Sequence, residues 1–141
     1  MSGFPSGFWK SPSISEVAGG GPAHFILSWS HNGTLSNDWM GITSVTAGAR
    51  VLAYKCQLIG IGFACTKDNA NTDLEIYKNG QAGGDLEYTW EIRSSRYDSI
   101  QLDTPIEFDP GDYIFLYGSD AGSNDPTDTH VDMVFEALLD D

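Results

Sequence analysis

The sequence predicts an all-β fold, an antiparallel jelly-roll sandwich of about eight strands with an extended N-terminal arm. Apolar residues recur with a period of two along 105–118 and 129–138, which places alternate side chains on one face of a strand. The chain also contains 16 glycines and 12% aromatic residues, a composition typical of strands joined by many turns. Its 141 residues fit one domain with one hydrophobic core.

The predicted strands follow one another at regular intervals from residue 23 onwards. Each is a run of aliphatic, β-branched and aromatic residues bounded by Gly, Asn, Asp or Pro. They cover residues 24–30, 38–43, 50–66, 73–78, 86–93, 99–108, 112–118 and 129–138. No segment has a helical pattern, and there is no internal repeat. The pattern alone leaves open an immunoglobulin-like pairing of the same strands.

The segment 50–66 is too long for one flat strand, and Gly60 and Gly62 predict a bulge or a bend within it. In one continuous strand, Cys56 and Cys65 would lie roughly 30 Å apart on opposite faces, because nine is an odd spacing. We therefore expect two reduced, mostly buried thiols.

A turn signal at Pro110-Gly111 separates two apolar strands. Proline presets its own φ, and glycine accepts the positive φ that a type II turn requires next. We interpret 105–118 as a hairpin that is followed by a long acidic loop and a closing strand. The alternation predicts one side formed by Phe108, Tyr113, Phe115 and Tyr117, and another formed by Val131, Met133 and Phe135.

The charge balance is strongly acidic, with 7 Lys and Arg against 20 Asp and Glu, a net charge of −13. This surface would repel nucleic acid and anionic lipid, so we expect neither as a partner. Either the acids keep a β-rich chain soluble, or they bind a basic partner or divalent cations. No apolar run reaches the roughly 18 residues of a membrane span, and the first residues lack a secretion signal, so we expect a chain that is made in the cytoplasm and is not exported by the Sec pathway.

Residues 1–22 differ in composition from the predicted jelly-roll domain at 23–141. Thirteen of the 22 are Gly, Ser or Pro, and a Gly-Gly-Gly-Pro hinge precedes the first strand. Spaced apolar residues within such a segment predict an arm that anchors on another surface, although they could instead pack on the chain's own sandwich. The predicted partner-binding residues are Phe4, Phe8, Trp9, Lys10 and Ile14.

Two loops rich in Asp and Asn are calcium candidates, because calcium binds six to eight oxygens. The same residue types are ordinary turn formers, and neither loop has EF-hand spacing. The stronger candidate offers Asp120, Asn124, Asp125 and Asp128, together with Asp132. The weaker offers Asp68, Asn69, Asn71, Asp73 and Glu75. Apart from calcium, the sequence predicts no cofactor.

Other side chains suggest further sites, each with a structural alternative. Trp29, Trp39, Trp90 and Tyr97 would form a platform for sugar rings, or would pack in the core. The three histidines are more typical of strand surfaces than of a zinc site. The motifs of hydrolases, metalloproteases and phosphate-binding loops are missing, so we expect no enzymatic activity.

The segment from about Ala49 to Leu138 resembles the C1q/TNF-like jelly rolls, in particular those of bacteriophage virion proteins such as head decoration proteins, head fibres and fibre tips. The residues that carry the resemblance most specifically are 74–80, LEIYKNG, and 108–112, FDPGD. The resemblance implies a homotrimer that packs sheet edges and aromatics about a threefold axis. It also implies that the N-terminal segment tethers the trimer to the particle.

Within that family, residues 1–22 show no collagen-like or coiled-coil stalk pattern. This favours a capsid decoration (cement) protein on the virion surface, bound to the major capsid protein. The alternatives are a receptor- or glycan-binding tip of a phage fibre, and a lectin-like or TNF-like module unconnected with any virion.

Overall fold

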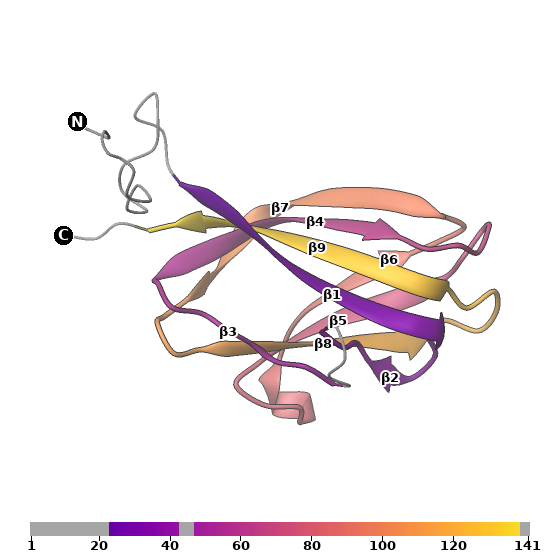
Figure 1. Cartoon of the computed structure of the whole chain (residues 1–141), viewed down its shortest axis with the longest axis horizontal. Coiled ribbons are helices and arrows are strands. Elements are labelled where there is room, and N and C mark those ends of the chain that lie inside the picture. The colour runs from indigo at the N-terminus through magenta and orange to yellow at the C-terminus, as the bar shows by residue number, and fades with distance from the viewer. Residues whose placement is uncertain (1–22, 43–46, 139–141) are drawn as a thin grey trace.

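The computed structural model describes residues 23–42 and 47–138, which form two antiparallel sheets packed face to face (Figure 1). The predicted all-β sandwich is confirmed. The predicted arm at 1–22, with Phe4, Phe8, Trp9, Lys10 and Ile14, lies outside the described residues.

Nine strands and one short 3-10 helix, η2 (Gly83–Asp85), make up the regular structure of the described residues. The strands are β1 (His24–Thr34), β2 (Asp38–Trp39), β3 (Arg50–Val51), β4 (Cys56–Ala64), β5 (Thr72–Lys78), β6 (Leu86–Ile92), β7 (Tyr97–Phe108), β8 (Tyr113–Asp120) and β9 (Thr127–Ala137). Among these residues, no helix has the length and apolar character needed to cross a membrane.

The chain passes repeatedly between the two sheets, as in a jelly roll rather than an immunoglobulin domain. The four-stranded sheet has the order β1-β9-β4-β7. The five-stranded sheet has the order β2-β8-β5-β6, with β3 also paired to β8. Strand β9, the last along the chain, therefore lies between β1 and β4 and pairs with both.

The predicted C-terminal hairpin is wrong. Strand β7 pairs with β4, whereas β8 pairs with β5, so the turn at Pro110-Gly111 connects the two sheets instead of two neighbouring strands. Gly111 has the positive φ, 92°, that was expected of it. Local turn chemistry fixes how tightly the chain reverses, but it does not fix which strand each arm of the turn will pair with.

The predicted common side for four aromatics is also wrong. Phe108 lies in the core with 1% of its surface exposed, whereas Tyr113, Phe115 and Tyr117 lie on the outer face of β8. Ile114 and Leu116 fill the inner positions of that strand. Strand β8 does alternate with a period of two, but large apolar residues occupy both of its faces, so the sequence does not reveal which face points into the core.

The core lies between the sheets and draws on every long strand. Its largest fully buried side chains are Trp29, Leu35, Met40, Leu58, Leu74, Ile76, Ile92, Phe108, Ile114, Leu116, Met133 and Phe135. The predicted inner side of β9 is confirmed, since Val131, Met133 and Phe135 are fully buried. Burial of each such side chain contributes roughly 1.5–3 kcal/mol to folding before conformational entropy is subtracted.

A bulge interrupts β4, as the glycines predicted. The register of β4 shifts between Leu58 and Gly60 against both β7 and β9. The extra residue reverses the alternation, so Cys56 and Cys65, which an unbroken strand would put on opposite faces, are both buried and free. Burial, followed by the charge of Asp112, raises the pKa of Cys56 to about 11.

Replacement of Gly118 by Ala should destabilise the sandwich by about 1–3 kcal/mol, because the core has no room for the added methyl group. A Cβ atom at Gly118 would approach the side chain of Leu35, which is fully buried, to well under van der Waals contact. The matched control is Gly83→Ala, where a Cβ atom meets nothing within 4 Å. Urea unfolding would measure both variants, and equal midpoints would contradict the prediction.

Candidate functional site

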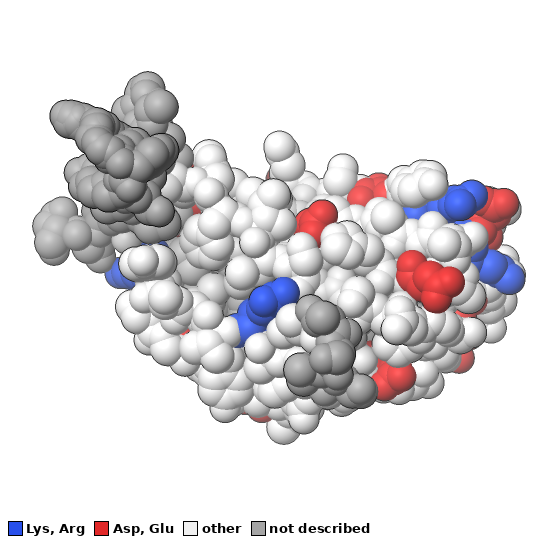
Figure 2. Space-filling view, viewed as in Figure 1, with Lys and Arg blue, Asp and Glu red and all other residues white. Residues whose placement is uncertain are grey.

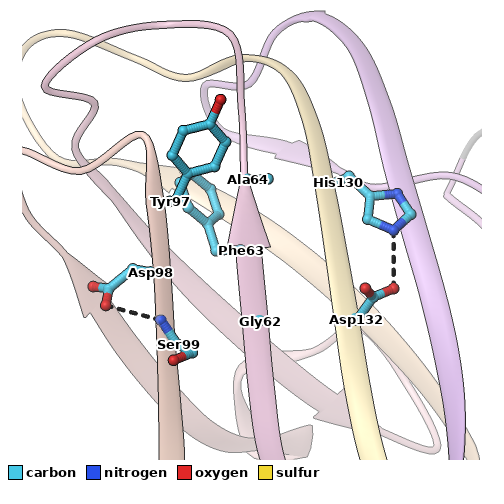
Figure 3. A pocket seen from close by; sticks show the side chains of 8 residues that line it. All are labelled: Gly62, Phe63, Ala64, Tyr97, Asp98, Ser99, His130 and Asp132. Carbon is cyan, nitrogen blue, oxygen red and sulfur yellow. Dashed lines mark hydrogen bonds and ion pairs between the residues drawn. The ribbon is translucent and has the colours of Figure 1, made fainter.

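A shallow groove runs along β4 on the outer face of the four-stranded sheet (Figure 3). The outward positions of β4 at its floor are Gly60, Gly62 and Ala64, so the floor is backbone with little side chain above it. Two adjoining hollows of about 510 and 410 Å³ share Gly62, Ser99 and Asp132. The volumes are within the usual size of a small-molecule or peptide-side-chain site.

One wall of the groove comes from β9 and β1. His130 Nε2 lies 2.9 Å from Asp132 Oδ1, and the hydroxyl of Ser28 donates to the same carboxylate oxygen. Further along this wall, Ile26 has 60% of its surface exposed beside Val134. This wall is therefore polar at Asp132 and His130 and apolar at Ile26 and Val134.

The other wall comes from β7. Tyr97 has 69% of its surface exposed, and the guanidinium of Arg96 lies 5.5 Å from the centre of its ring. Ser99 and Gln101 continue the wall, each facing outward from the strand. The ring of Tyr97 is thus a rigid apolar surface next to hydrogen-bonding groups.

The polar group of the groove is not arranged for nucleophilic catalysis. In a serine hydrolase the imidazole lies between the hydroxyl and the carboxylate, so that it can accept the hydroxyl proton. Here the carboxylate of Asp132 lies between Ser28 and His130. The arrangement fixes the orientation of Asp132 and is suited to contact with another molecule.

The floor and most of the walls carry no charge, in a chain whose net charge is −13. Asp98 and Asp132 are the only Asp, Glu, Lys or Arg residues among those that line the two hollows. Asp132 is already bonded to two donors, and Asp98 accepts from the backbone N–H of Ser99. The groove therefore holds two acidic side chains and no Lys or Arg, and both carboxylates are already hydrogen-bonded.

A second outward-facing feature lies on the five-stranded sheet. We call it the aromatic patch, and it consists of Trp39, Tyr77, Phe115 and Tyr117. The ring of Trp39 lies 5.0 Å from that of Tyr77, 5.8 Å from that of Phe115 and 4.7 Å from that of Tyr117, each in an edge-to-face arrangement. The predicted sugar platform is not assembled, since Trp29 and Trp90 are in the core and Tyr97 is in the groove on the other sheet.

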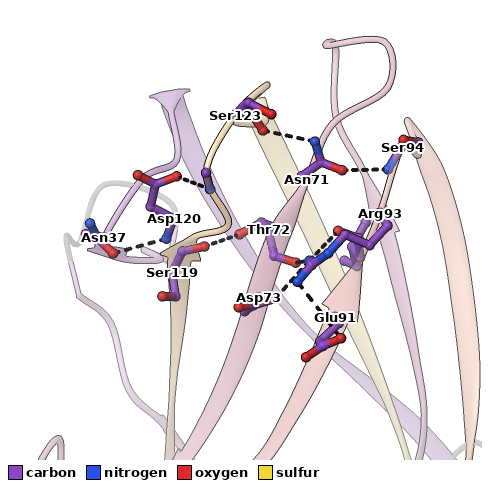
Figure 4. Close-up of polar contacts among 12 residues, drawn as sticks. Asn37, Asn71, Thr72, Asp73, Glu91, Arg93, Ser94, Ser119, Asp120 and Ser123 are labelled. Carbon is purple, nitrogen blue, oxygen red and sulfur yellow. Dashed lines mark hydrogen bonds and ion pairs between the residues drawn. The ribbon is translucent and has the colours of Figure 1, made fainter.

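The first predicted calcium loop brings only two of its acids together. The carboxyl of Asp125 forms a hydrogen bond with that of Asp120, which also accepts from the backbone of Gly122 (Figure 4 shows Asp120). Asp128 turns away and accepts from the backbone of Gly33 at 2.8 Å. Asn124 contributes its carbonyl oxygen, which accepts from the backbone of Asn71.

The second predicted loop is occupied by structural contacts (Figure 4). Asp73 forms a 2.9 Å ion pair with Arg93, and Asp68 forms one of 3.4 Å with Arg96. Asn71 bonds through its side chain to the backbones of Ser94 and Ser123. Within residues 23–42 and 47–138, no three His, Cys, Asp or Glu side chains come together as a metal site.

The histidines also stay apart. His24 faces Glu136 at 3.9 Å, His31 lies 2.8 Å from Asp38, and His130 bonds to Asp132. Each imidazole thus has its own carboxylate partner, and His31 is largely buried, whereas about half of the His24 and His130 side chains is exposed.

Comparison of the chain with models of known protein families finds no match, and comparison with curated proteins finds none either.

Replacement of Asp125 by Asn should raise the melting temperature at pH 7 by about 2–4 °C. Burial, then the charge and hydrogen bond of Asp120, raise the pKa of Asp125. A raised folded-state pKa means that the protonated form is favoured, so stability is fully present below the unfolded value and is lost as the pH rises through the folded value. The gain should therefore disappear near pH 3, and Asp128→Asn, which removes the same charge, should not show it. A gain that does not depend on pH would contradict the prediction.

Proposed function

We propose that the chain is a bacteriophage virion structural protein, a homotrimeric capsid decoration protein that docks on the major capsid protein through residues 1–22. The resemblance of residues 74–80 and 108–112 to phage jelly rolls supports this proposal. The jelly-roll fold is compatible with it, and the two outward surfaces described above are suited to contact with other molecules.

The observation that carries the proposal of self-association is the groove of the four-stranded sheet, where the two acidic side chains are both hydrogen-bonded within the domain. Copies of a chain with a net charge of −13 repel one another, so they can associate only where the acidic side chains are absent or already bonded. The floor at Gly60 and Gly62 allows a neighbouring copy to approach the backbone closely. Ile26 and Tyr97, two large hydrophobic side chains that are exposed on this face, would be buried by that contact at roughly 1.5–3 kcal/mol each.

The position of the chain ends supports attachment at one end of the domain. The backbone N–H of Ala137 donates to the carbonyl of Ala23, so residues 1–22 would enter the sandwich beside the end of β9. In the view of Figure 2, most of the charged side chains gather at the opposite end. A particle that bears such domains would present acidic surface outward and would repel other particles.

The second candidate function is a glycan-binding tip. The exposed ring of Tyr97 beside Ser99, Gln101 and His130 favours it, since an aromatic face next to hydrogen-bonding groups suits a sugar ring. The two functions exclude each other at this groove. If copies of the chain cover the groove, a glycan cannot reach it.

Replacement of Gly62 by Arg should convert the trimer into monomers without unfolding the domain. A Cβ atom at Gly62 meets nothing within 4 Å and would point into the groove, where a long charged side chain blocks the approach of a second copy. Light scattering coupled to gel filtration would measure the mass, and circular dichroism would check the fold.

The control is Gly83→Arg, which adds the same charge at a position that is equally open and far along the chain from the groove. It should remain trimeric. A trimeric Gly62→Arg variant would show that the groove is not the interface, and a monomeric parent chain would refute the trimer. Retention of that monomer on neutral glycans would then favour the tip function.

Deletion of residues 1–22 should abolish binding to capsids and leave the trimer intact, because Phe4, Phe8 and Trp9 are proposed to bury apolar surface between capsid subunits. Each buried aromatic would contribute roughly 1.5–3 kcal/mol before ordering costs, and three arms act together. Sedimentation with decoration-free capsids would measure binding. Co-sedimentation of the truncated chain would move the attachment site to the jelly roll, and failure of the full chain to sediment would refute the virion role.

A further inference from the structure

The aromatic patch is not used by either proposed function. It lies on the outer face of the five-stranded sheet, whereas the groove lies on the outer face of the other sheet. A trimer formed through the groove would therefore leave the patch accessible. What the patch can bind is decided by its ring geometry and its charge.

The rings of the patch do not lie in one plane. Trp39 and Tyr117 are directly opposite each other on β2 and β8, and Phe115 is opposite Tyr77 on β8 and β5. The plane of Trp39 is inclined at 63–66° to the planes of the other three rings. The rings therefore contact one another edge to face, and Tyr77 is buried beneath the others with 9% of its surface exposed. A compact group would bind on the half-buried outer faces of Trp39, Phe115 and Tyr117. A flat sugar-stacking surface would require rings that are nearly coplanar.

Two carboxylates adjoin these rings. Glu75 is opposite Tyr117 in the pairing of β5 with β8, and its Oε1 accepts the hydroxyl of Tyr77 at 2.7 Å. Asp38 precedes Trp39 in β2, and 51% of its side-chain surface is exposed. Burial is the largest cause that raises the pKa of Tyr117, and the negative charges of Glu75 and Asp38 raise it further. Both carboxylates are therefore close enough to affect the electrostatic potential at the patch.

The two arginines at the ends of this sheet are engaged elsewhere. Arg93, just after β6, pairs with Asp73 at 2.9 Å. Arg50, in β3, donates to the carbonyl of Ser28 on the other sheet. Glu75 accepts a hydrogen bond from the hydroxyl of Tyr77, which is a neutral donor and leaves the carboxylate charge in place.

We propose that the aromatic patch binds a guanidinium or ammonium side chain of a basic partner segment. The faces of aromatic rings carry partial negative charge and attract cations, and an arginine also stacks on them. Glu75 would supply the counter-charge and the hydrogen-bond acceptor, whereas Asp38, which is bonded to His31 and to the backbone of Trp39, adds negative charge beside the patch. An apolar partner would instead bury the Glu75 carboxylate without a charged partner, which is strongly unfavourable. The net charge of −13 would accelerate the encounter with a basic partner.

The test is calorimetric titration of the full chain with a capped Gly-Arg-Gly-Arg-Gly-Arg peptide and with the same peptide made with citrulline. Citrulline keeps the shape of arginine but has no charge, so it should bind at least about tenfold more weakly if a cation is recognised. Glu75→Gln should weaken the arginine peptide by about tenfold while its amide oxygen still accepts from Tyr77. Phe115→Leu keeps an apolar side chain and removes a ring face, and should weaken it by about threefold or more.

The matched control is Glu107→Gln, which removes the same charge from an exposed position of β7, on the other sheet. It should change the affinity by less than about twofold, as a remote surface charge is screened by salt. Each variant must keep the parent melting temperature and secondary structure, so that a loss of binding reflects the patch.

Four results would overturn the proposal. They are no binding of the arginine peptide, equal binding of the citrulline peptide, equal losses for Glu75→Gln and Glu107→Gln, and no loss for Phe115→Leu. The first three would rule out recognition of a cation at this position, and the last would rule out a contribution of the aromatic rings to binding. Binding of a neutral oligosaccharide that Phe115→Leu abolishes, without any preference for the charged peptide, would assign the patch to a sugar.

Discussion

The simultaneous pairing of β4 with β7 and β9 across one bulge is the constraint on which most of the molecule depends. The register of β4 shifts against both neighbours between Leu58 and Gly60. Before the bulge the even-numbered residues Cys56 and Leu58 face the core, and after it the odd-numbered residues Ile61 and Phe63 do so. The outer face receives the small residues that form the groove floor. One extra residue thus serves both the core and the surface.

The two outer faces of the sandwich have different chemical character, and this follows from their side chains. The four-stranded sheet has a floor of glycine and a small number of bonded charges, so a large flat surface can approach it. The five-stranded sheet has rings set at an angle beside Glu75, so a small charged group suits it better. A single domain can therefore assemble with copies of itself on one side and contact a different partner on the other.

Much of the fold could be predicted from the sequence, because the period of two in β8 and β9 and the glycines of β4 are local signals. The partners of these strands could not be predicted. The turn at Pro110-Gly111 has the same residues whether it joins neighbouring strands or two sheets, and this is why the hairpin was wrong. The aromatic patch was missed for a related reason. Tyr77, Phe115 and Trp39 come from three separate strands, and only the pairing of β2, β8 and β5 brings them together.

The position of β9 has a consequence for how the domain folds. β9 is the last of the described strands to be synthesised, yet it is the only strand that bonds β1 into its sheet along the length of that strand. Until β9 emerges, the backbone of β1 pairs only through the isolated bridge between Ser30 and Gly41, supplemented by side-chain hydrogen bonds such as those from Arg50 to Ser28 and from Trp29 to Gly48, within the described residues. The sandwich therefore cannot close before β9 has been synthesised. The pairing of β1 with β9 joins strands far apart in the sequence, which implies slow, non-local folding. A chain that terminates before Thr127 would leave the core open and β1 unpaired, so incomplete products would be removed by proteolysis and not assembled.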